Sequence, residues 1–332
     1  MNSINPSPAR FNLRALKQSR LANIGALPIL MVLSLVLFEM SNTRFLSADN
    51  LLNISQQSIF LILIALGQML VLVSGGFDLS VGATVALTSV VSSTAMVAVQ
   101  AGHPDNPTLA IAAGCGATVL VGMVVGLANG IGVSLFRVNP FIVTLATSSV
   151  ISGSTLLISQ GNEIGPLPDA FVFNIGSGMI AGMPVSILLA IPAVAIIYLL
   201  VNRFRYGRYL FAIGSNPKSA LVSGVRVNYQ LMLTYILCAL LTSFAGLLLT
   251  ARVSSGQPLL GAEYPLLSIT AAVIGGCSLK GGQGGVIGTL MGALFVTMLA
   301  NGMDLVRLGS NYQMIALGII LVIAVLLDRN RR

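Results

Sequence analysis

Asp78 is a lone carboxylate between two long apolar stretches, and its surroundings are the first in this sequence to suggest chemistry. It belongs to SGGFDLSVG at 74–82, where Gly75 and Gly76 precede it and Ser80 follows it. A carboxylate at the start of a helix accepts backbone N–H groups and is stabilised by the helix dipole. We therefore interpret Asp78 as the cap of the helix that follows. The alternative is a polar group on a transport pathway.

A second segment combines the signals for the start and the end of one short helix. Asn216 can cap a helix, Pro217 suits its first position, and Gly224 suits the residue after its end. The predicted helix covers 217–223, and the alternative is a loop that contains only a turn. A two-turn helix is unstable alone in water, so we expect it to pack against the rest of the chain or against a partner. The residues of this segment are Asn216, Pro217, Lys218, Ser219, Ala220, Leu221, Val222, Ser223 and Gly224.

Other reactive groups are too few or too scattered for catalysis. His103 is the sole histidine, and the 3 cysteines stand far apart in apolar stretches, without the spacing of a metal site or a disulfide framework. No GxxxxGK[ST] phosphate-binding motif is present. The apolar stretches also lack the paired carboxylates that proton-driven carriers use. We expect no catalytic residue, no metal and no bound cofactor. Energy for any transport must come from elsewhere, or none is used.

Composition shows which elements must position these residues. The 332 residues are 55% hydrophobic and only 8% charged, whereas soluble domains have roughly 25% charged residues. Such a composition predicts an integral membrane protein. The 17 Lys and Arg residues outnumber the 9 Asp and Glu residues. They lie at the ends of apolar runs, which argues against nucleic-acid binding.

Charged residues divide the chain into ten apolar runs, because a charge at the bilayer centre is costly. We predict an all-α membrane protein of about ten transmembrane helices. In the long run 170–202, the glycine-rich part 173–182 is expected to be irregular. The predicted spans lie near 21–38, 56–76, 80–100, 109–135, 140–160, 183–202, 229–250, 264–279, 285–303 and 309–327.

Lys and Arg are distributed unequally between the two sides of these spans. Three of the 17, Arg44, Arg252 and Arg307, lie on one side. The other fourteen are Arg10, Arg14, Lys17, Arg20, Arg137, Arg203, Arg205, Arg208, Lys218, Arg226, Lys280, Arg329, Arg331 and Arg332. Since basic residues favour the cytoplasmic side, both termini are predicted to be cytoplasmic. The predicted parts are an N-terminal segment 1–20, a transmembrane domain 21–327 with a cytoplasmic loop 203–228, and a tail 328–332.

Two short sequence echoes suggest internal symmetry. Ala-Asn-Gly occurs around Asn129 and again around Asn301, five predicted spans later, so the copies would be inverted as in many transporters. A second echo, between GGFDLS at 75–80 and GGCSL at 275–279, has another offset. The glycine-rich segment 275–285 is predicted to be a tight turn, or else a place where the backbone approaches another subunit.

Several motifs along nearly the whole chain resemble the inner-membrane permeases of ribose-type ABC sugar importers. Two departures are Phe77 and Asn139, where that family usually has Ile and Pro. The motifs are GGFDLSVG at 75–82, LANG at 127–130, VNPFIVTLAT at 138–147, GRYLFAIGSNPKSALVSGVRV at 207–227, ARVSSGQPLLGAEYPL at 251–266, VIGGCSLKGGQGGVIGTL at 273–290 and LANGMDL at 299–305.

The resemblance implies a fold similar to that of the cobalamin-importer permeases. It also implies partners: a second permease, either the same chain or a close paralogue, a pair of ATP-binding subunits, and a periplasmic sugar-binding protein. The helix at 217–223 would then be the coupling helix that docks into the ATP-binding subunit. The implied substrate is ribose or a related monosaccharide, carried across the bacterial inner membrane.

The three basic residues on the outer side have two interpretations. Arg44, Arg252 and Arg307 either pair with acidic residues of the docking protein or only anchor the ends of spans. The alternative to an importer subunit is a self-sufficient secondary carrier or channel for a small polar solute, which would need ion-coupling groups within its spans. A membrane enzyme would need clustered catalytic groups.

Overall fold

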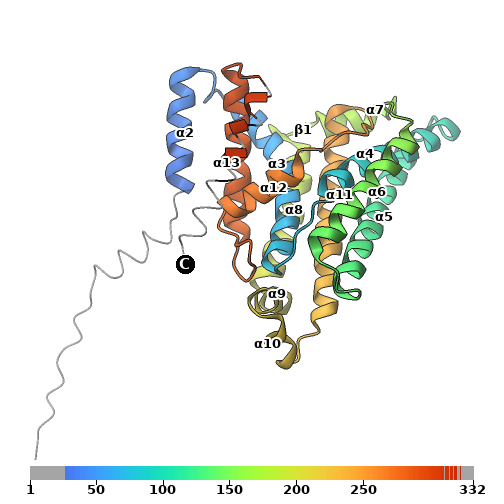
Figure 1. Cartoon of the computed structure of the whole chain (residues 1–332). Coiled ribbons are helices and arrows are strands. Elements are labelled where there is room, and N and C mark those ends of the chain that lie inside the picture. The colour runs from blue at the N-terminus through green and yellow to red at the C-terminus, as the bar shows by residue number, and fades with distance from the viewer. Residues whose placement is uncertain (1–26, 310, 314, 317, 320–321, 323–332) are drawn as a thin grey trace, which may run out of the picture.

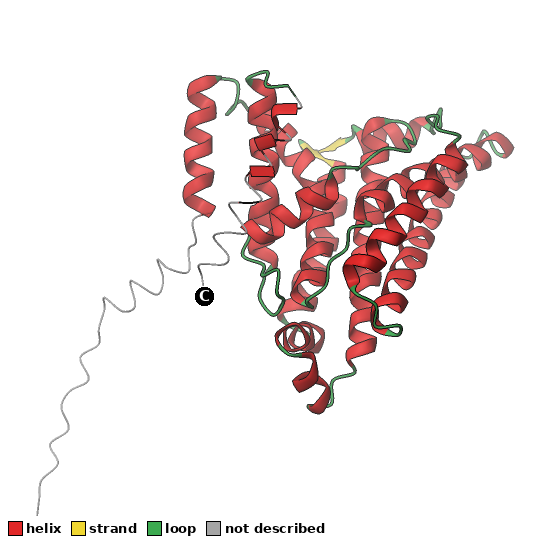
Figure 2. Ribbon diagram, in the orientation of Figure 1, coloured by secondary structure: helices red, strands yellow, loops and turns green. Residues whose placement is uncertain are grey.

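The computed structural model describes residues 27–309, 311–313, 315–316, 318–319 and 322. The secondary structure of this part of the chain is helical apart from one small hairpin, and loops and turns connect the helices (Figure 1 and Figure 2). The elements are α2 (Leu27–Ser41), α3 (Ala48–Val73), α4 (Val81–Gly102), α5 (Pro107–Ser134), α6 (Pro140–Ser159), α7 (Asp169–Phe171), the π-helix η1 (Val172–Gly176), β1 (Met179–Ile180), β2 (Met183–Pro184), α8 (Val185–Asn202), α9 (Arg205–Ser215), α10 (Pro217–Val222), α11 (Val227–Val253), α12 (Tyr264–Ile274) and α13 (Val286–Leu305).

Seven of the described helices are long and apolar enough to cross a membrane: α3, α4, α5, α6, α8, α11 and α13. Two other helices are apolar but shorter. α2 has 15 residues, and its predicted span at 21–38 lies partly outside the described residues. Most of the span predicted near 309–327 also lies outside them.

α12 differs from its predicted span. Its 11 residues rise about 1.5 Å each, which covers roughly half of a 30 Å hydrocarbon core. The segment 264–279 is therefore a half-length helix followed by non-helical chain. The helix stops because Gly275 begins a glycine-rich stretch.

The two Gly-Gly segments end their helices in the same way. After α3, the N–H groups of Gly75 and Gly76 bond back to carbonyls of the last turn, and after α12 those of Gly276 and Cys277 do the same. Gly75 and Gly276 both have left-handed backbone, with φ of 86° and 95°. This is the Schellman motif, which a residue with a side chain enters only with strain. The echo between 75–80 and 275–279 thus marks two equivalent helix ends.

α11 lies at the centre of the bundle and packs against α3, α4 and α5. α5 has a glycine at every fourth position over 122–130, and a Cβ at Gly126 would lie 2.5 Å from the Cα of Ile236. Small residues of this kind let membrane helices approach closely. This close packing places Gly126 of α5 against the backbone of Tyr235 of α11, and both helices contribute to the buried polar cluster described below.

The segment between α6 and α8 is irregular, as predicted for 173–182. α7 passes directly into η1, and the hairpin β1–β2 follows. Ala181 and Gly182 connect its strands with positive φ values of 52° and 79°, the backbone of a tight hairpin turn. α8 begins at Val185, two residues after the predicted start of its span.

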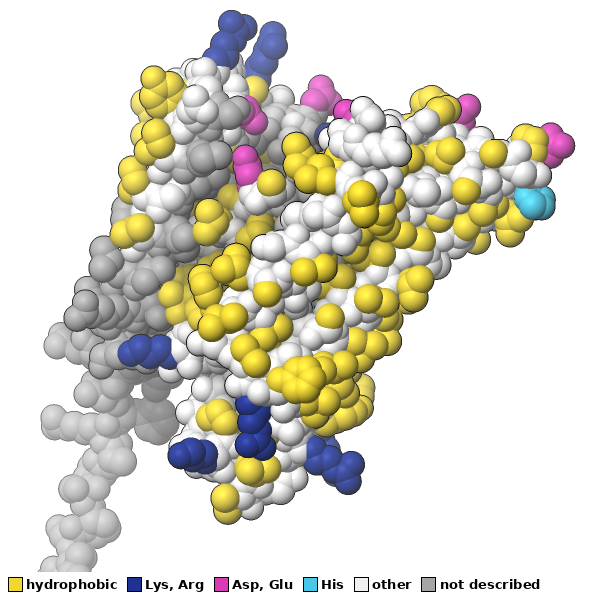
Figure 3. Space-filling model, turned by 45° about the vertical axis from the view of Figure 1, so that its right-hand side comes forward, with side chains coloured by type: hydrophobic (Ala, Val, Ile, Leu, Met, Phe, Trp, Pro, Cys, Tyr) yellow, Lys and Arg dark blue, Asp and Glu magenta, His cyan; other side chains and the backbone are white. Residues whose placement is uncertain are grey.

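The described charged residues separate toward the two ends of the bundle. In Figure 3, Asp and Glu side chains are visible only over the upper part, and the charged side chains visible at the lower end are all Lys or Arg. We call the lower end, which holds α9 and α10, the α10 end. Its described basic residues are Arg137, Arg203, Arg205, Arg208, Lys218, Arg226 and Lys280, and those of the opposite end are Arg44, Arg252 and Arg307.

Candidate functional site

Asp78 lies in a buried polar cluster between α3, α4, α5 and α11. Its Oδ1 accepts the backbone N–H of Ser80 at 2.8 Å and the Ser80 hydroxyl at 2.6 Å. The amide of Asn129 donates to the Ser80 hydroxyl at 2.9 Å and lies 3.5 Å from Asp78 Oδ2. The thiol of Cys238 is a further donor to the carboxylate. The hydroxyl of Tyr235 donates to the carbonyl oxygen of Phe77 at 3.3 Å.

This cluster corrects the capping interpretation of Asp78. Ser80, not Asp78, occupies the N-cap position of α4, and its side chain makes no capping hydrogen bond. Asp78 instead bends the chain just before the helix. Asp78, Ser80 and Asn129 are at most 1% exposed, so the cluster is sealed from solvent in this conformation. It ties the connection 74–80 to α5 and α11 through neutral donors, which stabilise a buried carboxylate.

The helix predicted at 217–223 is confirmed as α10, which ends one residue earlier. Asn216 is its N-cap, and the side-chain oxygen of Asn216 accepts the N–H of Ser219 at 3.0 Å. Pro217 occupies the first turn, and Gly224 follows the end of the helix with a φ of 84°. Each of these residues thus has the role that its type predicts.

α10 is held by packing on one face and exposes apolar side chains on the other. Ala220 is buried against Ile213 of α9 and Val225. Leu221 and Val222 are 62% and 89% exposed. Exposed apolar residues at the tip of a rigid helix are typical of a site where a partner protein docks.

α9 is a functional element that the sequence reasoning missed. Its signal was the helical spacing of Tyr206, Leu210 and Ile213, all buried, with Arg205 and Arg208 exposed on the other face. α9 connects α8 to α10 and carries α10 on its end.

Tyr206 fixes α9 to the membrane bundle. Its hydroxyl lies 2.9 Å from the hydroxyl of Thr234 in α11. Burial raises the pKa of Tyr206 above its ordinary value, so the phenol stays protonated and able to donate this hydrogen bond. α9 therefore moves with α11 and not as a free loop.

Three backbone segments meet at the α10 end in what we call the glycine junction, formed by Val73, Gly214 and Gly282. The N–H of Gly282 donates to the carbonyl oxygen of Val73 at 2.9 Å. A Cβ at Gly214 would lie 1.8 Å from that oxygen and 2.5 Å from the Gly282 nitrogen. The segment 275–285 is therefore not only a tight turn, because its backbone also contacts the ends of α3 and α9 of the same chain.

The three basic residues of the opposite end do not share one environment. Arg44 and Arg307 are exposed. Arg252 instead directs its guanidinium toward α3, where it donates to Asn53 Oδ1 at 3.1 Å and also to Gln56 Oε1. Arg44 and Arg307 are therefore free to meet a partner, whereas Arg252 joins α11 to α3.

Asn301 has a structural partner at the same end. Its side-chain oxygen accepts a hydrogen bond of 2.9 Å from the amide of Asn50 in the first turn of α3. Asn129 belongs instead to α5 and bonds to the chain that enters α4. α5 ends at the α10 end, whereas α13 ends at the opposite one, so the two Ala-Asn-Gly copies run in opposite directions (Figure 1).

Among the described residues, no group of three or more His, Cys, Asp or Glu side chains could hold a metal ion. A bundle of apolar helices with a buried polar cluster and an exposed, capped helix at one end has the organisation of the membrane-spanning part of a transporter. Residues 50–325 match the family described as the permease component of branched-chain amino acid transport systems. The chain belongs to this family of transport permeases.

Curated relatives cover almost the whole chain. The ribose import permease protein RbsC of Bacillus subtilis is 39% identical over 297 residues, which are 89% of each chain. RbsC of Escherichia coli K12 is 36% identical over 87% of this chain and 88% of its own. The D-allose transport system permease protein AlsC of the same strain is 32% identical over 92% and 91%. No solved structure matches the chain.

Proposed function

We propose that this chain is the membrane-spanning subunit of an ATP-driven importer that carries ribose or a related monosaccharide into the cytoplasm. The observation that carries the proposal is the 39% identity, over 89% of both chains, to a permease named for ribose import. The family description refers to branched-chain amino acids, but several relatives at 32–39% identity are named for the sugars ribose, allose and galactose. A sugar is therefore the better-supported substrate class.

The ATP-binding subunit is proposed to dock on α10. Leu221 and Val222 project from this helix, and Asn216 and Gly224 hold its two ends in place. Closure of the ATP-binding subunits would push α10, and α9 would pass the movement through the glycine junction to α3. Such a push drives transport only if the outward-open and inward-open states differ in their affinity for the partners and the sugar.

The α10 end is proposed to face the cytoplasm. Seven of the ten described Lys and Arg residues lie there, and cytoplasmic segments of membrane proteins are rich in these residues. With ten spans, both termini lie on this side. The parts are then a segment 1–20, a permease domain 21–327 with its coupling loop 203–228, and a tail 328–332. In a bacterial cell the protein spans the inner membrane.

The opposite end is proposed to receive a periplasmic sugar-binding protein, with Arg44 and Arg307 as its charged contacts. A second permease, identical or closely related, is proposed to complete the pore. Specificity then comes mainly from the binding protein, since the buried cluster around Asp78 exposes no polar group to a solute in this conformation.

Reconstitution in proteoliposomes with the ATP-binding subunit and the binding protein tests the proposal. We expect ATP-dependent uptake of ribose in preference to allose, galactose and leucine. The variant Gly224→Val should lose sugar-stimulated ATP hydrolysis, because Val is strained at a φ of 84°. Gly224→Asn is the matched control, since Asn tolerates this backbone. Uptake without ATP would favour a self-sufficient carrier, and normal coupling in Gly224→Val would contradict the role of α10.

A further inference from the structure

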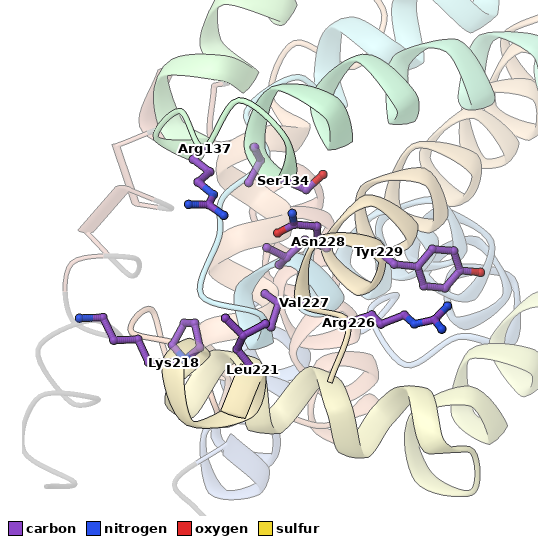
Figure 4. A pocket seen from close by; sticks show the side chains of 11 residues that line it. Ser134, Arg137, Lys218, Leu221, Arg226, Val227, Asn228 and Tyr229 are labelled. Carbon is purple, nitrogen blue, oxygen red and sulfur yellow. The ribbon is translucent and has the colours of Figure 1, made fainter. Parts of the chain in front are cut away.

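A pocket of about 630 Å³ lies at the α10 end, between the end of α5, α10 and the start of α11. Figure 4 shows Arg137 reaching toward it from the α5–α6 connection, with Leu221 and Val227 forming an apolar floor. Lys218 lies at one margin and Arg226 at the other. The pocket is thus an apolar cavity with Arg137 directed toward it, and with Lys218 and Arg226 at its margins with their charged ends pointing outward.

Charge favours an anion in this pocket. Arg137, Lys218 and Arg226 line it, and none of the described residues on its wall is an Asp or Glu. The backbone of Arg137 is left-handed, with φ of 56°, and turns its side chain toward the pocket. Guanidinium groups bind phosphate through paired N–H donors, so phosphate is the anion that this set fits best.

The start of α11 supplies a second, independent feature. This helix of 27 residues begins at Val227 with no side-chain cap and no acidic residue in its first turn. Val227, Asn228 and Tyr229 of that turn line the pocket. The N–H groups and the dipole at an uncapped helix start attract an anion.

Ser134 supplies a third feature. Its side chain is 2% exposed and lines the pocket, yet its hydroxyl has no hydrogen-bond partner among the described residues. A buried hydroxyl without a partner costs about 1–3 kcal/mol. The Ser134 hydroxyl could donate a hydrogen bond to an oxygen of a bound phosphate group, which would remove that cost.

The surroundings show which kind of phosphate fits. Phe136 directly precedes Arg137, and Phe141 and Ile142 lie in the first turn of α6; they are 75%, 50% and 59% exposed, so exposed apolar side chains flank Arg137 in the chain. A free phosphate ion gains nothing from such a surface, whereas an acyl chain buries it. Basic pockets between transmembrane helices are known to hold anionic lipid headgroups.

We propose that this pocket binds the headgroup of an anionic phospholipid such as phosphatidylglycerol. Arg137 holds the phosphate, Lys218 and Arg226 add positive charge at the margins, Ser134 and the start of α11 donate hydrogen bonds to the phosphate, and the acyl chains cover the apolar side chains that flank Arg137 in the chain. The site goes beyond the proposed transport function and does not depend on the transported solute. It shares Lys218 and Leu221 with the helix on which the ATP-binding subunit is proposed to dock, so it is tested on the chain without that subunit. A bound lipid here would fix the α5–α6 connection against α10 and α11.

Lipid retention by the full-length chain tests the proposal, using dioleoylphosphatidylglycerol as the probe and native mass spectrometry as the measurement. Each removed charge should weaken retention about fivefold, so Arg137→Gln/Arg226→Gln should lose about 25-fold. Arg208→Gln, which removes an exposed arginine of the same end that is not on the pocket wall, should retain the lipid like the unmodified chain.

Ser134→Ala separates binding from folding. Because the Ser134 hydroxyl has no partner without lipid, its removal should leave the melting temperature in lipid-free detergent unchanged or higher, while phosphatidylglycerol should bind more weakly. Equal retention by the unmodified chain and both pocket variants would overturn the proposal. So would equal binding of phosphatidylcholine, or displacement of the lipid by millimolar inorganic phosphate, which would indicate a site for a free anion.

Discussion

The N–H of Gly282 donates to the carbonyl oxygen of Val73 at 2.9 Å, so the loop after α12 completes the last turn of α3. Carbonyls at a helix end lack a partner within the helix, and here another part of the chain supplies one. Gly214 of α9 packs against the same hydrogen bond. Any movement of α9 and α10 therefore reaches the end of α3 through backbone contact, without flexible side chains in between.

Gly214→Ala should separate α9 from α3. Its Cβ would lie 1.8 Å from the Val73 oxygen, so one of the three segments must move. Overpacking of this kind costs about 1–3 kcal/mol and should lower the melting temperature of the purified chain. In the reconstituted importer we expect ATP hydrolysis to continue with less sugar transported per ATP, as measured by uptake and phosphate release in parallel.

Gly153→Ala is the control for this experiment. Gly153 lies in the helix α6, and a Cβ there would meet no atom within 4 Å. Since Ala favours helix more than Gly, the variant should be neutral or slightly stabilising. A Gly214→Ala chain that couples and melts like Gly153→Ala would show that the glycine junction transmits nothing.

Ser80→Ala should destabilise the bundle. The change removes the donor 2.6 Å from Asp78 and the acceptor of the Asn129 amide, and both partners stay buried. We expect a loss of about 1–3 kcal/mol in unfolding free energy. Thermal and denaturant unfolding in detergent would measure it. Ser149→Ala, at an exposed hydroxyl that bonds only to its own helix, should change almost nothing, and equal losses would contradict the role of the cluster.

Local signals in the sequence predicted α10 almost to the residue. Asn216, Pro217 and Gly224 act within one or two turns of the chain, so no distant contact is needed to interpret them. Asp78 was misassigned for the opposite reason. Its partners include Asn129, 51 positions away, and spacing along a sequence does not show which distant side chain a carboxylate meets.

The count of spans shows the same limit. Apolar runs predict which segments enter a membrane, but the predicted span 264–279, the shortest of the ten, contains a helix of only 11 residues. α12 ends at Gly275, where an added Cβ would lie 2.3 Å from the Gly288 oxygen of α13. Arg252 was likewise grouped with Arg44 and Arg307 by side of the membrane, although it bonds within the chain.

Asn216→Ala should weaken assembly with the ATP-binding subunit. The change removes the side-chain oxygen that accepts the Ser219 N–H, which costs about 1 kcal/mol at a helix start. A loosened α10 no longer presents Leu221 and Val222 in one geometry, so the affinity for the ATP-binding subunit should fall. Asn216→Asp keeps the acceptor and should assemble normally in co-purification. If both variants assembled equally well, the cap would have no part in docking.

Arg44→Gln/Arg307→Gln should slow association with the sugar-binding protein. Both side chains are exposed at the end opposite α10, and exposed charges act mainly on the association rate, which salt screens. In surface plasmon resonance we expect a lower association rate at low salt and little difference at high salt.

Arg252→Gln should leave this rate unchanged and instead lower the melting temperature, because Arg252 bonds to Asn53. Arg208→Gln removes a charge from the α10 end and serves as the matched control. If the unmodified chain and all three variants associated at the same rate at every salt concentration, Arg44 and Arg307 would have no part in docking.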